Sequence, residues 1–340
     1  MLLKKYAALL LHYCLELKAG ERLYLQTTTL AEPLVREIHR EATKIGAIVE
    51  AQLEFAGQSR IFIDNLQNDF QYNYVSPLYQ KAMEEFEAYL YIRAPFNLRE
   101  RQNINKENAA RRQQATKALR ETYFRRTATR DLRRSLCQYP TQASAQEAGM
   151  SLEEYENFVF QACQLHTDDP MQAWLKVRQQ QQGIVDHLNQ CETIRYVGDG
   201  TDIAFSTKGR TWINSDGQTN MPSGEIYTSP VEDSVNGHIH FSFPAIHGGH
   251  EVEGVTLWVE DGEIKKWEAK RGQEYLDYIF QIQGTRRFGE AAIGNNFNID
   301  TFTKNILFDE KIGGTVHMAI GQSYLQAGGK NTSAVHWDMI

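Results

Sequence analysis

Hydrophobic and polar positions change their period along the chain, and this change divides it into two regions. Up to about residue 100, short apolar runs at 22–26, 47–53 and 87–93 alternate with helical patterns. Strand, helix and strand at this spacing predict a parallel sheet with crossover helices. The first residues predict an amphipathic helix, because apolar side chains recur at three- and four-residue steps: Leu3, Tyr6, Leu10, Tyr13 and Leu17.

Helix starts are marked by capping residues in this region and just beyond it. Thr29-Leu-Ala-Glu32 and Ser151-Leu-Glu-Glu154 both have the pattern of a capping box. Asp169 followed by Pro170 predicts the start of a further helix that runs to about residue 188. Helices therefore dominate the chain up to about residue 190.

After Cys191 the pattern alternates with period two, which is typical of half-buried strands. Residues 259–264 contain an Asp-Gly turn between apolar positions and predict a hairpin. One helix is expected around 274–283. The predicted fold is an α/β N-terminal domain with a parallel sheet and crossover helices over residues 1–190. An α+β C-terminal domain rich in antiparallel strands follows over residues 191–340, and we expect it to be the metal-binding, catalytic domain.

Composition and charge exclude several classes of protein. The 340 residues carry 36 Lys and Arg against 43 Asp and Glu, a net charge of -7, which does not suggest a dedicated nucleic-acid binder. No run approaches the roughly 20 apolar residues of a membrane span. The four cysteines are far apart and form no Cys-x-x-Cys pair, which argues against a thiolate zinc site or a disulfide framework. A reducing, cytoplasmic setting is expected.

Common cofactor and hydrolase motifs are missing. The first strand-to-helix turn, residues 25–33, contains no glycine, so a dinucleotide cofactor is not expected there. The sequence has no Gly-x-Ser-x-Gly and no His-Glu-x-x-His, which argues against a serine hydrolase and against the commonest zinc peptidase helix.

The segment from Arg101 to Arg134 is strongly basic, with 11 Lys and Arg against 3 acids. One interpretation is a face that binds phosphate or an acidic partner, in which case the protein would be a non-catalytic binding protein. The favoured interpretation is a solvated helix pair, because Tyr123 and Phe124 are the only aromatic residues in the segment.

Candidate metal ligands gather in the C-terminal region. Glu225 and Glu290 each follow a glycine and precede apolar residues, where a carboxylate is costly unless a cation meets it. On a strand, His336 and Asp338 would share one face, about 7 Å apart along the chain. His317 lies in an apolar strand, and a hydrogen-bonded core histidine is the more common explanation there.

Two histidine pairs offer an alternative. His238 and His240 resemble the His-x-His of amidohydrolase barrels, and a metal hydrolase that uses them would need a closed barrel of eight parallel strands. The apolar residues around them favour side chains that point to solvent or to a cleft wall. His247 and His250 flank two glycines and favour a surface turn.

Four stretches resemble the aminopeptidase T/aminopeptidase S family of two-metal exopeptidases, and the likeness runs over the whole chain. They are Asn220-Met-Pro-Ser-Gly-Glu-Ile-Tyr-Thr-Ser-Pro-Val231, Phe288-Gly-Glu-Ala-Ala-Ile-Gly-Asn-Asn296, Asp309-Glu-Lys-Ile-Gly-Gly-Thr-Val-His-Met-Ala-Ile-Gly321 and Gly328-Gly-Lys-Asn-Thr-Ser-Ala-Val-His-Trp-Asp-Met-Ile340. The resemblance implies these metal ligands: Glu225, Glu290, His317, His336 and Asp338. It also places Tyr324 at the metal centre, as a ligand or as a hydrogen-bond donor to the reacting carbonyl, and leaves Glu290 as a proton shuttle as well as a ligand.

The resemblance further implies a metallo-aminopeptidase with two divalent metal ions, for which zinc, cobalt, manganese and magnesium all suit the ligands. A hydroxide that bridges the ions would attack the first peptide bond of a peptide with a free N-terminus. A homodimer with an enclosed active chamber is implied as well. The interval from His317 to His336 is shorter than the family pattern implies, which predicts a trimmed loop near the site. The family pattern also continues further than Ile340.

Overall fold

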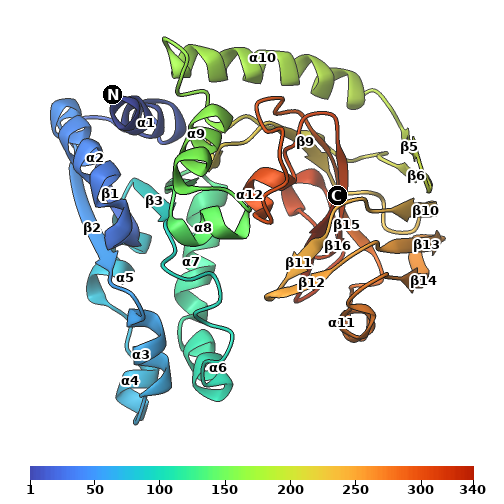
Figure 1. Ribbon diagram of the computed structural model, residues 1–340, viewed down its shortest axis with the longest axis horizontal. Helices are drawn as coiled ribbons and strands as arrows, with labels where there is room; N and C mark the ends of the chain where they lie inside the picture. Colours follow the sequence, from blue (N-terminus) through green and yellow to red (C-terminus); the bar gives the residue numbers. More distant parts are fainter. The chain divides into compact units, whose positions relative to one another are not determined.

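The computed structural model describes residues 1–340, which form two compact units (Figure 1). The N-terminal unit comprises Met1–Met171 and Gly217–Pro222, and the C-terminal unit comprises Gln172–Asp216 and Ser223–Ile340. This division falls inside one helix and assigns residues 217–222 to the N-terminal unit. A domain boundary at residue 190 stays a prediction.

The N-terminal unit alternates strands and helices, as its sequence pattern predicts. Its elements are α1 (Leu2–Ala8), a π-helix η1 (Leu9–Cys14), β1 (Arg22–Thr28), a 3-10 turn η2 (Thr29–Ala31), α2 (Glu32–Ile45), β2 (Ile48–Glu54), α3 (Gln58–Asp64), α4 (Asp69–Asn73), α5 (Pro77–Glu85), β3 (Ala88–Arg93), α6 (Lys106–Ala115), α7 (Lys117–Ala128), β4 (Arg133–Gln138), α8 (Gln142–Glu147), α9 (Leu152–Ala162) and β8 (Asn220–Met221).

The strands of this unit form one parallel sheet in the order β2-β1-β3-β4-β8, with helices on both sides of it (Figure 1). Leu23, Leu25 and Leu90 are fully buried in the sheet. On one side Tyr24 contacts Tyr79 of α5, with the ring centroids 5.9 Å apart. The predicted parallel sheet with crossover helices is confirmed.

Two helix starts test the capping predictions. Ser151 caps α9 by accepting from the backbone of Glu154, whose carboxylate accepts from the backbone of Ser151, so the second capping box is confirmed. The first is wrong. Thr28 caps the short turn η2, and α2 begins at Glu32 with Pro33 in its first turn and no side-chain cap. A proline lacks the N–H that a cap would satisfy, so this start does not depend on the capping box.

The C-terminal unit is built mainly from strands. Its elements are α10 (Pro170–Leu188, which starts in the N-terminal unit), β5 (Thr193–Gly198), β6 (Thr201–Ser206), β7 (Ile213–Ser215), β9 (Glu225–Thr228), β10 (Asn236–His240), β11 (Ala245–His247), β12 (His250–Val252), β13 (Thr256–Glu260), β14 (Glu263–Glu268), α11 (Gln273–Ile279), β15 (Phe288–Gly294), α12 (Ile306–Asp309), β16 (Val316–Gly321), a 3-10 turn η3 (Leu325–Ala327) and β17 (His336–Met339).

Antiparallel pairing holds this unit together, as predicted. Two five-stranded sheets have the orders β14-β13-β10-β6-β5 and β17-β16-β15-β9-β7, and β11 and β12 form a small hairpin. Asp261 and Gly262 both adopt positive φ, +49° and +75°, in the turn between β13 and β14, which is the conformation that a two-residue hairpin turn requires. None of the helices in either unit is both long enough and apolar enough to cross a bilayer.

Candidate metal centre

The sheet β17-β16-β15-β9-β7 brings the predicted ligands together on one face. Glu225 lies opposite Gly294, His317 opposite Ala292, and Asp338 opposite Ala319, while His336 lies opposite Gly321. Because side chains alternate between faces with period two, Glu290 shares the face of residues 292 and 294. The intervening residues on the other face are apolar and belong to the core: Ile226, Ala291, Met318, Ile320, Trp337 and Met339.

Two glycines explain how the glutamates reach this face. Gly224, before Glu225, has a φ of +103°, and a Cβ there would lie 2.7 Å from Cβ of Asn296. At Gly289, before Glu290, a Cβ would lie 2.2 Å from the carbonyl oxygen of Gln322, and the register between β15 and β16 shifts at this point. A larger residue at either position would force the strands apart.

The distances within the cluster are those of neighbouring polar groups. His336 Nε2 lies 3.1 Å from Glu290 Oε2 and 3.4 Å from Asp338 Oδ1. His317 Nε2 lies 3.8 Å from both Glu225 Oε2 and Glu290 Oε1. All five predicted ligands therefore converge, and the side chains of Glu225, Glu290 and His317 are buried.

Several buried polar atoms in this cluster lack a hydrogen bond. Neither ring nitrogen of His317 makes one, and Oδ1 of Asp338 has only the ion-pair contact with His336 Nε2 at 3.4 Å. The expectation that His317 is a hydrogen-bonded core residue is therefore wrong: the ring is buried, but it makes no hydrogen bond and instead faces the carboxylates of Glu225 and Glu290 at 3.8 Å. Unpaired buried nitrogen and carboxylate oxygen atoms that face one another are the donor set that a divalent cation requires, so the residues fit a metal ion.

Two overlapping groups could each hold an ion, with ligand atoms within 4.8 Å of one another. One contains Glu225, Glu310 and His317, and the other contains Glu290, His317 and Asp338. Glu310 was not among the predicted ligands. It lies inside one of the motifs that carry the family resemblance, but nothing in its neighbours along the chain indicates that its side chain turns towards His317.

A buried lysine also lies at the site, and it was not among the residues predicted from the sequence. Lys311 is fully buried, with Nζ 3.6 Å from Glu225 Oε1 and in contact with the carboxylate of Glu310. One lysine offsets only part of the charge of the four carboxylates, so the cluster keeps an excess of negative charge.

Neighbouring charges shift the pKa values of the histidines and of Asp338 in the cluster. Burial on its own would lower the pKa of His336, but Asp338 and Glu290 raise it to about 11. His317 behaves in the same way, because Glu290 and Glu225 outweigh its burial and raise its pKa to about 9. Burial would raise the pKa of Asp338, yet the charge of His336 holds it at about 2. The carboxylates thus draw in positive charge, which a divalent ion can supply in place of protons.

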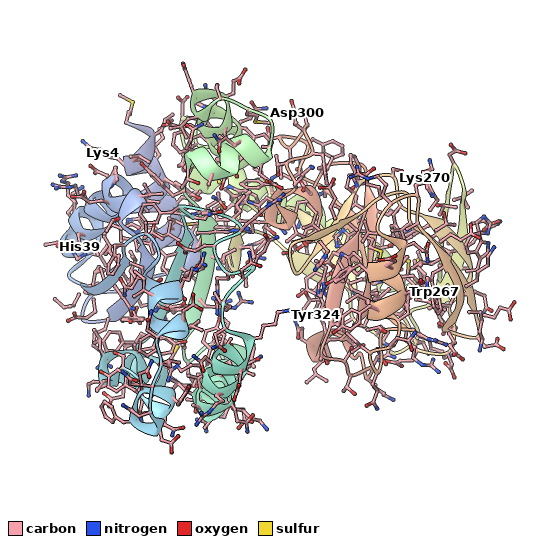
Figure 2. All side chains as sticks on the ribbon, turned by 60° about the horizontal axis from the view of Figure 1, so that its bottom comes forward. Lys4, His39, Trp267, Lys270, Asp300 and Tyr324 are labelled. Carbon is pink, nitrogen blue, oxygen red and sulfur yellow. The ribbon has the colours of Figure 1, made fainter.

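Backbone and aromatic contacts orient the side chains of His336 and Tyr324 at the site. The carbonyl oxygen of Gln322 lies 2.8 Å from Nδ1 of His336 and can only accept, so Nδ1 carries a proton and Nε2 faces the carboxylates. Tyr324, labelled in Figure 2, follows β16 and places its hydroxyl 3.4 Å from His336 Nε2. Its ring packs on that of Tyr227, with the centroids 4.9 Å apart. The sixth predicted site residue therefore also lies at the cluster.

The alternative histidine pairs lie elsewhere. His238 and His240 are on β10 of the other antiparallel sheet, and Nδ1 of His240 lies 2.9 Å from the hydroxyl of Thr256. These sheets are antiparallel, so the barrel of eight parallel strands is wrong. His247 and His250 flank the turn between β11 and β12, as expected of a surface turn, and Nδ1 of His247 lies 2.8 Å from the hydroxyl of Tyr275.

An α/β unit together with an antiparallel sheet that gathers carboxylates and imidazoles is typical of a metal-dependent hydrolase. The chain belongs to the thermophilic metalloprotease family M29, whose model matches residues 1–340. The predicted resemblance is confirmed, and so is the predicted enzyme class, a metallo-aminopeptidase.

Named relatives agree with this family. Aminopeptidase 2 of Geobacillus stearothermophilus is 27% identical over 379 residues, covering 99% of this chain and 91% of the relative. Aminopeptidase AmpS of Bacillus subtilis is 31% identical over 184 residues, 49% of this chain and 44% of the relative. The solved structure of wild-type AmpT from Thermus thermophilus covers 100% of this chain and 92% of its own, with a TM-score of 0.84 and 24% identity, and it confirms the fold.

Proposed function

We propose that the protein is a two-metal aminopeptidase that removes the N-terminal residue from peptides with a free α-amino group. The observation that supports this proposal is the gathering of four carboxylates and two imidazoles in one cluster, because a single catalytic ion needs only about three protein ligands. The names of the relatives supply the substrate class. As ligands we propose Glu225, Glu290, His317, His336 and Asp338, with Glu310 as a sixth because its carboxylate lies close to the ligand atoms of Glu225 and His317.

The carboxylate and imidazole donors suit zinc, cobalt, manganese or magnesium. Divalent ions held by these carboxylates and imidazoles would supply Lewis-acid chemistry, which polarises a carbonyl and lowers the pKa of water. The protein's own groups then have to place the substrate carbonyl and move a proton to the leaving amine.

Tyr324 is suited to stabilise the oxyanion that develops at the substrate carbonyl. Burial, together with the charges of Glu290 and Asp338, raises the pKa of its hydroxyl well above the usual value. The phenol therefore keeps its proton at neutral pH and can donate a hydrogen bond. Packing on Tyr227 limits its movement.

Glu290 and His336 have positioning roles as well as ligand roles. The Gln322 carbonyl fixes the tautomer of His336, so that Nε2 is the nitrogen available to an ion. Glu290 lies between His317 and His336 and is the carboxylate best placed to carry a proton from the attacking water to the leaving amine.

Metal analysis combined with turnover tests this proposal. Purified protein should contain up to two equivalents of a divalent metal and hydrolyse leucine p-nitroanilide. Chelation should abolish both the metal signal and turnover, and refilling should restore them together. Full turnover by metal-free protein would disprove the metal-dependent mechanism.

Two further properties stay predictions, one from the family resemblance and one from the cysteines. We propose a homodimer, which equilibrium sedimentation would test. A cytoplasmic setting is supported by the four cysteines, all of which are free. Cell fractionation would test this location.

A further inference from the structure

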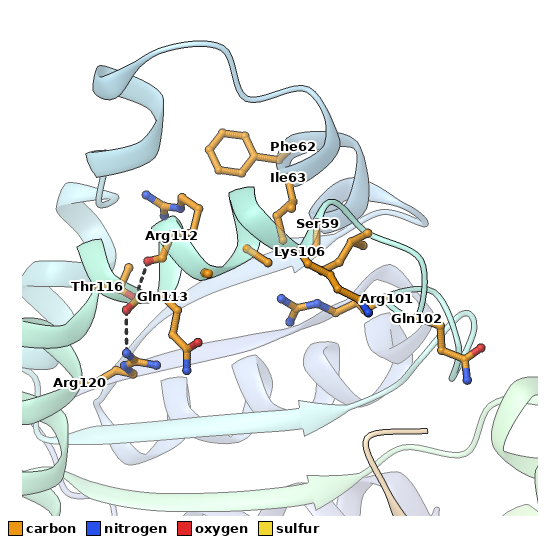
Figure 3. Close-up of a pocket in the computed structure, with 13 residues that line it drawn as sticks. Ser59, Phe62, Ile63, Arg101, Gln102, Lys106, Arg112, Gln113, Thr116 and Arg120 are labelled. Carbon is orange, nitrogen blue, oxygen red and sulfur yellow. Dashed lines mark hydrogen bonds between the residues drawn. The ribbon is translucent and has the colours of Figure 1, made fainter. Parts of the chain in front are cut away.

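The N-terminal unit contains a cavity that the proposed peptidase reaction does not use. It has a volume of about 760 Å³ and lies between α3, the loop before α6, and the start of α7 (Figure 3). Four cations line it, namely Arg101, Lys106, Arg112 and Arg120, and the lining contains no aspartate or glutamate. The cavity falls within the size range of sites for small molecules.

The cations of this cavity, unlike several of their neighbours, form no salt bridge, although Arg101 lies near enough to Glu54, outside the lining, to interact with its charge. None of the four lies within 4 Å of a carboxylate, whereas Arg111 on α6 pairs with Asp69 at 2.8 Å. Lys117 on α7 lies 4.0 Å from Glu121. The basic segment 101–134 therefore forms salt bridges outside the cavity and none at the cations that line it.

Backbone oxygen atoms hold two of these cations in place without cancelling their charge. Arg112 Nη1 donates to the carbonyl oxygen atoms of Tyr72 and Tyr74, at 2.7 and 2.6 Å, and burial lowers the pKa of this guanidinium. Arg120 Nη2 donates to the carbonyl oxygen of Gln113 at 2.7 Å. Such preorganisation reduces the entropy lost when a ligand binds.

Apolar surface lies beside the charges. Phe62 exposes 40% of its surface, and Arg112 lies above its ring, 5.5 Å from the centroid, while the neighbouring Ile63 is buried. Phe62 is the only aromatic residue in the lining. A surface built to bind a nucleic acid strand would need several stacking rings, so the cavity suits a small ligand better.

We propose that this cavity binds a small organic anion that carries two negative charges on oxyanion groups and a short apolar part. Guanidinium groups match phosphate and carboxylate oxygen atoms through paired hydrogen bonds, and Lys106 adds a compact charge. The apolar part would lie on Phe62 and Ile63. Phosphate esters and dicarboxylates share this chemistry, and the proposal does not depend on the reaction at the metal centre.

Calorimetric titration of the full-length, metal-loaded protein tests the proposal. The probes are phenyl phosphate and benzene-1,3-dicarboxylate, with benzamide as the neutral ring. We expect saturable binding of at least one anion, weakened by added salt, and none of benzamide. Comparison of the two anions shows whether the cavity prefers a phosphate or a dicarboxylate.

Substitutions inside and outside the cavity test whether the anion binds there. R101Q and R120Q should each weaken it by about tenfold or more, the scale of one charge-assisted hydrogen bond. K117Q and R125Q remove the same charge from α7 outside the cavity and should leave affinity within about twofold. E290Q should bind the anion as the unmodified protein does, although its peptidase activity is lost.

Four outcomes would overturn the proposal. They are no saturable binding of either anion at low salt, equal weakening in K117Q and R120Q, loss of binding in E290Q, and binding of a single-stranded oligonucleotide without binding of the small anions. Thermal unfolding of each variant checks its fold, and R101Q keeps the test valid if R120Q unfolds, because Arg101 is exposed.

Discussion

The interiors of the two units differ in charge. In the N-terminal unit the buried polar side chains are neutral: Thr27, Asn108, Ser135, Gln138, Thr141 and Ser144. In the C-terminal unit the buried polar side chains include several that can carry charge: Glu225, Glu290, Asp309, Lys311 and His317. A charge is costly to remove from water, whereas a neutral hydroxyl or amide needs only one hydrogen bond.

The apolar interior contributes to stability, whereas the charged interior is the one that suits a metal site. The N-terminal sheet is stabilised by apolar packing around Leu23, Leu25 and Leu90, and its uncompensated charges lie at an open cavity instead. The C-terminal sheet keeps an apolar core on one face and gathers charges on the other, where the carboxylates are stabilised by positive charge from Lys311 and the imidazoles. Substitutions in the two interiors should therefore affect different properties.

The largest expected effect is on activity at the charged face. Glu290→Gln or His336→Ala should lower turnover of leucine p-nitroanilide by roughly a thousandfold or more and reduce bound metal, because each removes a proposed metal ligand. Turnover and metal content are measured together. His238→Ala, outside the cluster, is the matched control, and an active Glu290→Gln protein with a full metal content would contradict the assignment.

A substitution in the apolar core of the N-terminal unit should lower stability and leave metal binding unchanged. Leu90→Ala, at a fully buried position of β3, should lower the free energy of unfolding of the N-terminal unit by about 2–5 kcal/mol, because it leaves a cavity. Urea unfolding measures this change. The metal content of the folded protein should stay the same, and a loss of metal in parallel with stability would show that the two interiors are coupled.

Tyr324→Phe distinguishes catalysis from metal binding. We expect a fall in kcat of about ten- to a hundredfold, because one oxyanion hydrogen bond is removed, with metal content unchanged. If metal is lost to the same degree as in His336→Ala, then Tyr324 is a ligand rather than a hydrogen-bond donor.

The smallest effect is expected at an ion pair of the N-terminal unit. Arg22 Nη2 lies 2.8 Å from Glu87 Oε1, and this hydrogen bond lowers the pKa of Glu87 despite partial burial. A lowered pKa stabilises the fold above the pKa of the unfolded chain, and this contribution is lost as the pH falls through the folded value. Glu87→Gln should therefore cost about 0–1 kcal/mol at neutral pH, since both groups are partly exposed, and less in acid.

Unfolding midpoints of both proteins across the acid range measure that difference. A gap between Glu87→Gln and the unmodified protein that widens as the pH falls would contradict the assigned sign.

Some features follow from residues that are neighbours along the chain, and the sequence predicts them well. The Ser151 capping box, the Asp261-Gly262 turn and the strand that holds His336 and Asp338 are local, because backbone dihedral angles and nearby hydrogen bonds decide them. The alternation of apolar and polar residues likewise predicts a parallel sheet followed by antiparallel ones.

The sequence by itself thus predicted the fold class and, through the family resemblance, named five candidate ligands and Tyr324, which the structure brings into one cluster. Only the tertiary structure brings Glu310 and Lys311 to those ligands, leaves His317 without a hydrogen bond and separates the paired from the unpaired cations of 101–134. The physical reason is that these relations depend on strand register and on side chains far apart in sequence, and no local pattern of residues encodes the distance between them.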